Sequence, residues 1–148
     1  MIKLSIAKSE IDRLAAQVVA EWEEEVLDKM TALCDRAIEE QWLKFRPEGY
    51  NDQTGQLRSS TGYIIYHNGK VVREMFKQAN YGTDKAPGLK AGREYAFGMR
   101  RESVAWGVLF VAGMEYASYV QGKGFSTLDT AEMIVEKNLL KELDSITL

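Results

Sequence analysis

The first third of the chain carries a long stripe of apolar residues. From Ser9 to about Phe45 they recur at steps of three, four and one, the spacing of a single helix face. The stripe consists of Ile11, Leu14, Ala15, Val18, Val19, Trp22, Val26, Met30, Leu33, Cys34, Ala37, Ile38 and Trp42. At ~1.5 Å per residue this helix would be about 55 Å long, whereas a compact domain of this size is roughly 35–40 Å across. We therefore expect the helix to bend, or one end to project and pack on another molecule, with both tryptophans in the core.

A β-hairpin is predicted over residues about 62–76. Two strand-like runs, at residues 63–66 and 71–72, flank the turn His67-Asn68-Gly69-Lys70. Its Asn-Gly pair suits a type I′ turn. Just before it, Thr54–Ser60 reads TGQLRSS and predicts a short helical turn capped by Thr54.

The second half of the chain is less regular. Residues 80–102 contain four glycines and a proline without a steady period, which predicts a long basic loop. Residues 104–112 (VAWGVLFVA) would be apolar on both faces of a strand, which predicts a central strand covered on both sides. A short helix over 115–121 and a C-terminal helix over about 127–143 follow.

The order of these elements predicts the fold class. Residues 1–148 should form a single α+β domain with a long N-terminal helix and a small antiparallel sheet of about three to four strands. The sheet should include the hairpin, and the C-terminal helix should pack on it.

Charge is unevenly distributed along the chain. Its 148 residues carry a net charge of −3, with 45% hydrophobic and 28% charged residues. Residues 1–45 carry −4, residues 46–101 carry +5 and residues 102–148 carry −4. A basic middle between acidic ends predicts that complementary surfaces meet, while a pI near 5.3 is not that of a nucleic-acid-binding domain.

The composition also bears on location. No apolar run approaches the ~20 residues of a membrane span. The N-terminus lacks the apolar segment of a signal peptide, so we expect the protein to stay in the compartment where it is made.

Candidate chemistry is sparse. Cys34 and His67 are the only cysteine and histidine, which excludes an intramolecular disulfide and any site that needs two histidines. Cys34 lies on the helix stripe and is interpreted as a buried thiol, whereas His67 is expected to be solvated at the hairpin turn. Phosphate-loop, dinucleotide, nucleophile-elbow and zinc-protease motifs do not occur. The sequence predicts neither catalytic residues, nor a cofactor, nor a metal site.

The basic segment at 80–102 leaves three interpretations open. It could be an idle loop, a segment that orders against a partner subunit, or a contact for nucleic acid. Its candidate contact residues are Lys85, Lys90, Arg93, Tyr95, Phe97, Arg100 and Arg101.

Two short stretches carry a family resemblance. The long helix running into Pro47 is followed by Thr54–Ser60, and the strand ending near Gly113 is followed by EYASYVQ at 115–121. Together they resemble the tail-completion or head–tail joining (neck) proteins of long-tailed bacteriophages and prophages, which carry "TGxLRxS" and "YAxYVExG". Gln121 here replaces the family's usual acid. The matching residues are Thr54, Gly55, Leu57, Arg58, Ser60, Tyr116, Ala117, Tyr119 and Val120.

Physical chemistry suggests a use for the first of these motifs. Gly55 permits tight packing or a positive φ, Leu57 can anchor the turn in the core, and Arg58 can form a forked pair with a carboxylate. The motif residues could hold the fold, contact a neighbouring subunit, or do both.

The resemblance implies a structural, non-enzymatic virion protein. Such a protein is made in the bacterial host cytoplasm and forms a ring, six-fold or a multiple of six-fold. It completes the tail and joins it to the head, so its partners are its own copies, the head connector or adaptor, and the tail tube or terminator proteins. Nucleic acid would be near only because the DNA channel passes through the ring. The alternatives are a generic adaptor, or a small cytoplasmic enzyme or nucleic-acid-binding accessory protein that uses residues 80–102 as a lid or contact.

Overall fold

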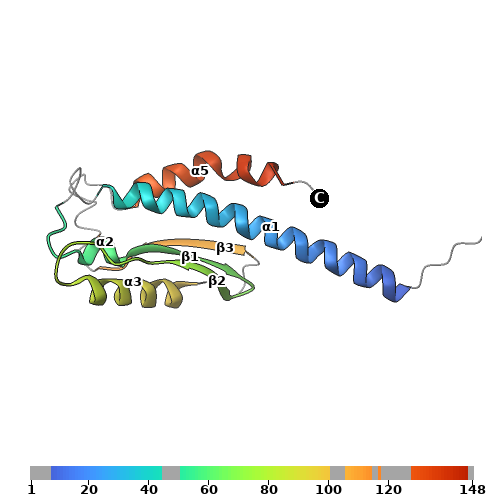
Figure 1. Cartoon of the computed structure of the whole chain (residues 1–148), viewed down its shortest axis with the longest axis horizontal. Coiled ribbons are helices and arrows are strands. Elements are labelled where there is room, and N and C mark those ends of the chain that lie inside the picture. The colour runs from blue at the N-terminus through green and yellow to red at the C-terminus, as the bar shows by residue number, and fades with distance from the viewer. Residues whose placement is uncertain (1–7, 45–50, 101–105, 115–116, 118–127, 147–148) are drawn as a thin grey trace, which may run out of the picture.

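The protein has a three-layer α+β architecture, seen here in a computed structural model that describes residues 8–44, 51–100, 106–114, 117 and 128–146. A three-stranded sheet lies between two helices above it and one helix below it (Figure 1). The elements are α1 (Lys8–Trp42), α2 (Gln56–Ser60), β1 (Thr61–His67), β2 (Lys70–Met75), α3 (Lys85–Met99), β3 (Trp106–Ala112) and α5 (Asp129–Asp144). The predicted fold class is confirmed. The predicted short helix over 115–121 lies almost wholly outside the described residues.

The sheet is antiparallel, with strand order β2-β1-β3. The predicted hairpin is confirmed: β1 and β2 pair from Tyr63↔Met75 to His67↔Lys70, with a bulge between Ile65 and Tyr66. Asn68 and Gly69 close it with φ values of 51° and 82°. Two consecutive positive φ values define the type I′ turn, whose twist matches that of the strands.

The central strand is β1, not the 104–112 segment predicted for that place. β3 covers Trp106–Ala112 and pairs only with β1 among the described strands. Its apolar character on both faces has a different cause, because the helix layers above and below the sheet extend over its edge. Phe110 packs with the α1 side and Val111 with the α3 side. A strand that is apolar on both faces is therefore one with a helix layer on each side of it, whether it lies at the centre or at the edge of the sheet.

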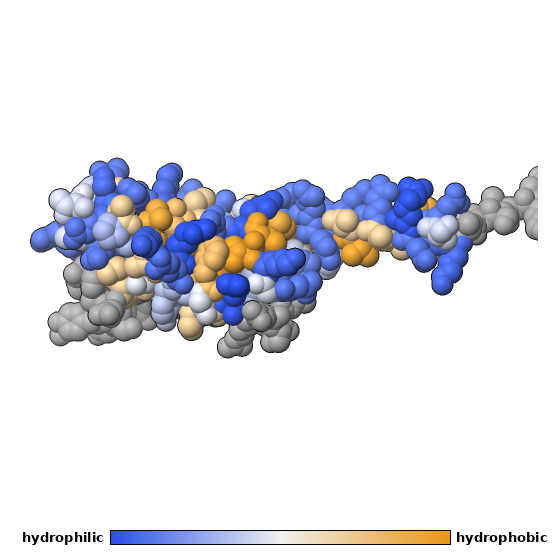
Figure 2. All heavy atoms as spheres, turned by 90° about the horizontal axis from the view of Figure 1, so that it is seen from below, coloured by the Kyte–Doolittle hydropathy of each residue, from blue (hydrophilic) through white to orange (hydrophobic). Residues whose placement is uncertain are grey.

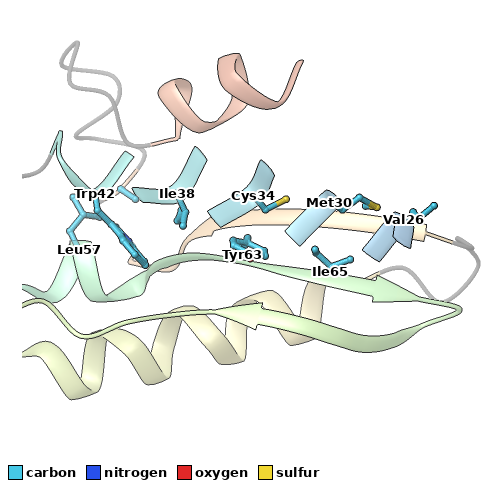
Figure 3. Close-up of a cluster of buried hydrophobic side chains, with 9 residues drawn as sticks. Val26, Met30, Cys34, Ile38, Trp42, Leu57, Tyr63 and Ile65 are labelled. Carbon is cyan, nitrogen blue, oxygen red and sulfur yellow. The ribbon is translucent and has the colours of Figure 1, made fainter. Parts of the chain in front are cut away.

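The main core lies between α1 and the upper face of the sheet. Val26, Met30, Cys34, Ile38 and Trp42 descend from successive turns of α1 onto Tyr63 and Ile65 of β1, with Leu57 of α2 at one end (Figure 3). Trp42 is therefore a core residue as predicted, and its indole Nε1–H donates to the carbonyl of Thr61 over 2.9 Å.

The predicted long loop over 80–102 is wrong, because Lys85–Met99 form helix α3. Gly88, Gly92 and Ala96 are buried and four residues apart, so they form one smooth helix face. A Cβ at Gly88 would lie 2.5 Å from the carbonyl oxygen of Gln56, and one at Gly92 would lie 2.2 Å from that of Ser60. Pro87 lies in the first turn, where a helix needs no backbone donor. The glycines allow close packing of a helix and do not mark a loop.

Helix α5 lies on the same side of the sheet as α1 and packs along it (Figure 1). The buried side chain of Gln41 accepts a hydrogen bond from the backbone N–H of Ala131 through Oε1, at 3.1 Å. Because the first N–H groups of a helix have no partner within that helix, Gln41 of α1 satisfies one end of α5.

Candidate assembly surface

The N-terminal half of α1 projects beyond the rest of the molecule (Figure 1). Every residue from 8 to 22 is exposed, and the buried positions of the helix begin only at Val26. We call residues 8–22 the projecting half. A helix of this length was expected either to bend or to project at one end. It projects, because the sheet below α1 is too short to cover it.

The projecting half carries an apolar stripe that the rest of the described chain leaves uncovered. Its larger members are between 38% and 54% exposed: Ile11, Leu14, Val18, Val19 and Trp22. Figure 2 shows apolar side chains gathered on the underside of this half, beyond the body of the molecule. Trp22 is thus not a core residue, in contrast to the prediction.

The stripe is costly to leave in water. Full burial of one large apolar side chain contributes about 1.5–3 kcal/mol, so covering five half-exposed ones would contribute roughly 4–8 kcal/mol. Contiguous exposed apolar surface of this kind marks interaction sites in proteins. The projecting half is therefore a candidate contact surface.

The stripe leads into an apolar groove of about 780 Å³ on the body of the molecule, between α1, β3 and α5. All but two of the lining residues are apolar or glycine, the two exceptions being Glu132 and Glu136. The lining consists of Trp22, Val26, Met30, Leu33, Cys34, Trp106, Gly107, Val108, Phe110, Leu128, Glu132, Val135, Glu136, Leu139, Leu143 and Ile146. Trp22 belongs to both the stripe and the groove, so the two form one continuous surface.

Sequence reasoning did not find the groove. It predicted a 104–112 strand covered on both sides and a C-terminal helix packed on the sheet, and the structure leaves most residues of β3 and α5 partly exposed.

His67 and Trp106 stand near the end of the groove. Their rings stack at 4.1 Å between centroids and 10° between planes. The Nε2 atom of His67 lies 4.0 Å from a carboxylate oxygen of Glu23. The imidazole expected to be solvated is instead packed on an indole, and it helps to fix Trp106 at the groove.

Cys34 is buried on the inner face of α1, as predicted. Burial, with a smaller contribution from the charge of Asp35, raises the pKa of its thiol to about 12. A thiol in this state is a poor nucleophile, so its role is packing.

The Thr54–Ser60 motif is a structural junction. Gly55 immediately precedes α2 and has a φ of 72°, a left-handed conformation that glycine adopts without strain. A Cβ at this position would lie 2.3 Å from the carbonyl oxygen of Tyr81. The carbonyl of Thr54 accepts from the N–H of Asp84, and that of Ser60 from the N–H of Gly113. Leu57 is fully buried, as expected. These contacts join α2 to the segments before α3 and after β3.

Arg58 does not form a forked pair with a carboxylate among the described residues. Its guanidinium lies over the ring of Trp42, 4.8 Å from the centroid. Its backbone N–H, not its side chain, donates to Asp52 at 2.9 Å. Burial lowers the pKa of the guanidinium, while the charges of Tyr81 and Asp52 act in the opposite direction. Arg58 thus holds the end of α1 against α2.

The second motif can be assessed at one position only. Ala117 is described and belongs to the main core, whereas Tyr116, Tyr119 and Val120 lie outside the described residues.

The predicted contact residues of the 80–102 segment mostly serve α3 and its packing. Arg93 donates to both carboxylate oxygens of Glu74, at 2.7 and 3.2 Å, and Lys90 lies 4.0 Å from Glu94. Arg93 also stacks over Phe97 at 4.6 Å.

The last residues of this segment follow the same pattern. Arg100 donates to the carbonyls of Gly69 and Phe97, while Tyr95 is exposed, Lys85 is half-buried and Arg101 lies outside the described residues.

None of the described helices is long and apolar enough to cross a membrane. Across the described ranges, no three cysteine, histidine or acidic side chains come together as a metal ion would require. Comparisons with protein-family models, with curated proteins and with solved structures gave no match.

Proposed function

We propose that this protein is a structural subunit of the neck of a long-tailed phage or prophage. Its copies would form a ring, six-fold or a multiple of six-fold, that completes the tail and joins it to the head connector. The proposal combines the resemblance of the two motif stretches with the assembly surface described above.

The observation that carries the proposal is the projecting half of α1. Its fifteen consecutive exposed residues carry an apolar stripe that no described part of the chain covers. A subunit whose working state is an oligomer is expected to display such a surface when it is alone, because its neighbours complete the burial. The proposed contacts therefore run through α1 and the groove, and not through the 80–102 segment.

The test is quantitative mass spectrometry of phage particles purified from the source strain. Peptides of this chain should be present at a fixed ratio to the major tail protein, corresponding to a handful to about a dozen copies per particle. Deletion of the gene should yield separate heads and tails, and complementation should restore joined particles. An abundant cytoplasmic host protein measured in the same samples gives the level of contamination. Presence in the lysate but not above that level in particles would contradict the proposal.

A further inference from the structure

We propose that the groove between α1, β3 and α5 receives the projecting half of α1 from a second copy of this chain. The inference rests on the proposed assembly role and names the partner and the surface through which assembly proceeds.

The groove and the projecting half both present large apolar side chains. Large apolar side chains line the groove, and large apolar side chains form the stripe. An open groove of about 780 Å³ with a mainly apolar lining is contiguous exposed apolar surface, which marks interaction sites in proteins.

The spacing of the stripe also fits. Ile11, Leu14, Val18 and Trp22 follow steps of three, four and four, and Val26, Met30 and Leu33 continue at four, four and three. The second set is the one that α1 already uses to pack on the sheet and line the groove. The projecting half thus presents the kind of face that this body binds within its own chain.

The chain's own projecting half cannot fill its groove. Helix α1 is continuous from Lys8 to Trp42, and its first half points away from the body (Figure 1). Folding back would require breaking the helix near Trp22. The proposed occupant is therefore the projecting half of another molecule.

A second copy is favoured over a membrane surface. Acidic residues outnumber basic ones in and just after the projecting half, with Glu21, Glu23, Glu24 and Glu25 close together. Anionic lipid surfaces attract basic segments and repel acidic ones.

The size of the contact supports the same occupant. The apolar side of the fifteen-residue projecting half would meet a groove lined by sixteen residues. A standard protein interface uses about 20–30 residues a side, so this contact would form part of one.

The contact is one-directional. One copy gives its projecting half and the next gives its groove, so each bound copy still has one free surface of the other kind. Contacts of this type propagate, and they close into a ring when the rotation between copies allows it. The proposed docking is thus a contact from which a ring can be built.

The experiment uses two variants of the full chain. The stripe variant, Leu14→Asp with Val18→Asp, adds two charges to exposed positions and leaves the groove intact. Its control, Ala16→Asp with Ala20→Asp, adds the same charges at the same spacing on the other side of the helix. The groove variant is Leu139→Asp, and its control is Leu140→Asp, at a neighbouring residue that is 75% exposed and outside the groove.

Native mass spectrometry and sedimentation velocity measure the outcome. The wild-type chain and both controls should form oligomers of more than two copies, and each of the two variants alone should be monomeric. An equimolar mixture of the two variants should give 1:1 heterodimers, because only the groove variant's stripe and the stripe variant's groove remain intact. Circular dichroism checks that each variant is folded, and Leu143→Ser replaces Leu139→Asp if the latter unfolds.

Three results would overturn the inference. They are a wild-type chain that stays monomeric at its highest soluble concentration, a folded groove variant that assembles like the wild type, and a mixture of folded variants that stays monomeric. The second result would mean that stripes meet stripes, or that the groove binds something else.

The inference and the proposed function fail separately. If stripe and groove variants assemble normally while the chain is found in particles, only the docking contact is wrong. If the variants behave as expected but particles lack the chain, the docking contact stands and the neck assignment is wrong.

Discussion

Two ionisable side chains at the centre of the core are held in their neutral forms. Burial raises the pKa of the Cys34 thiol to about 12. Burial, together with a hydrogen bond from the Tyr63 hydroxyl to Asp35, raises the pKa of Tyr63 above its ordinary value of 10.0. Both groups pack between α1 and β1, so their protonation is linked to the stability of the layer that supports the groove.

We predict that the free energy of unfolding falls as the pH rises from about 9 towards 12. In this range the unfolded chain loses the Cys34 proton while the folded chain keeps it. The stability contributed by the raised folded-state pKa is complete below the unfolded pKa and is lost progressively as the pH rises towards the folded pKa. Urea unfolding at pH 8, 9 and 10 measures the slope, and Cys34→Ala should have a shallower one. Tyr63 remains in the variant and adds its own loss above pH 10. Equal slopes in the two proteins would contradict the prediction.

The motif residues mark how far single residues can be interpreted from sequence. Local chemistry allowed tight packing or a positive φ at Gly55 and burial of Leu57, and the structure shows all of these. The stacking of Arg58 on Trp42 could not be predicted, because the two residues come from different helices and meet only through the fold. A local pattern can predict what a residue is able to do, but its partner depends on tertiary packing.

At the scale of elements, the sequence pattern predicted a helix or strand correctly where a single signal was present. It failed where helix-disfavouring residues and a helical spacing occurred together. Helix α1, the hairpin and α5 were predicted near their observed bounds. Helix α3 was predicted as a loop, since glycine and proline disfavour helices on average. The regular four-residue spacing of Gly88, Gly92 and Ala96 outweighs that preference, because it places the small residues on the buried face.

Substitutions at two glycines of α3 should therefore have opposite effects. Gly92→Ala places a Cβ 2.2 Å from the Ser60 carbonyl oxygen and within 2.8 Å of two further backbone atoms. Overpacking against backbone costs about 1–3 kcal/mol. Gly98→Ala meets nothing within 4 Å and should stabilise by up to about 1 kcal/mol through helix propensity. Thermal and urea unfolding measure both, and a Gly92→Ala protein as stable as Gly98→Ala would contradict this account of α3.

At the scale of the whole molecule, helix length predicted a feature that the structure shows, whereas the contacts expected from the charge distribution stay a prediction. A helix longer than its domain predicted a projecting end, and the structure has one. The basic middle predicted a charged contact surface, yet Arg93, Lys90 and Arg100 of that region have partners within the chain. The groove could not be predicted from sequence because it forms where three elements distant in sequence leave space between them.

Salt should distinguish an apolar contact from a charged one. If copies assemble through the stripe and the groove, raising NaCl from low concentration to about 0.5 M should leave self-association unchanged or strengthen it, because screening also reduces repulsion between acidic chains. A contact between the basic middle and the acidic ends would weaken instead. Sedimentation velocity at both salt concentrations measures the difference, and dissociation at high salt would contradict assembly through the apolar surface.

The projecting half also bears on how long a free copy survives. This segment is held as a helix by its own backbone hydrogen bonds and by its continuation into the packed half, with no described tertiary contact. Isolated helices of about this length are marginal in water, and segments that open locally are the ones that proteases cleave. A copy without a neighbour would display such a segment, whereas a docked copy would conceal it. Unassembled copies would then be degraded first, which would match the supply of subunits to the number of assemblies that need them.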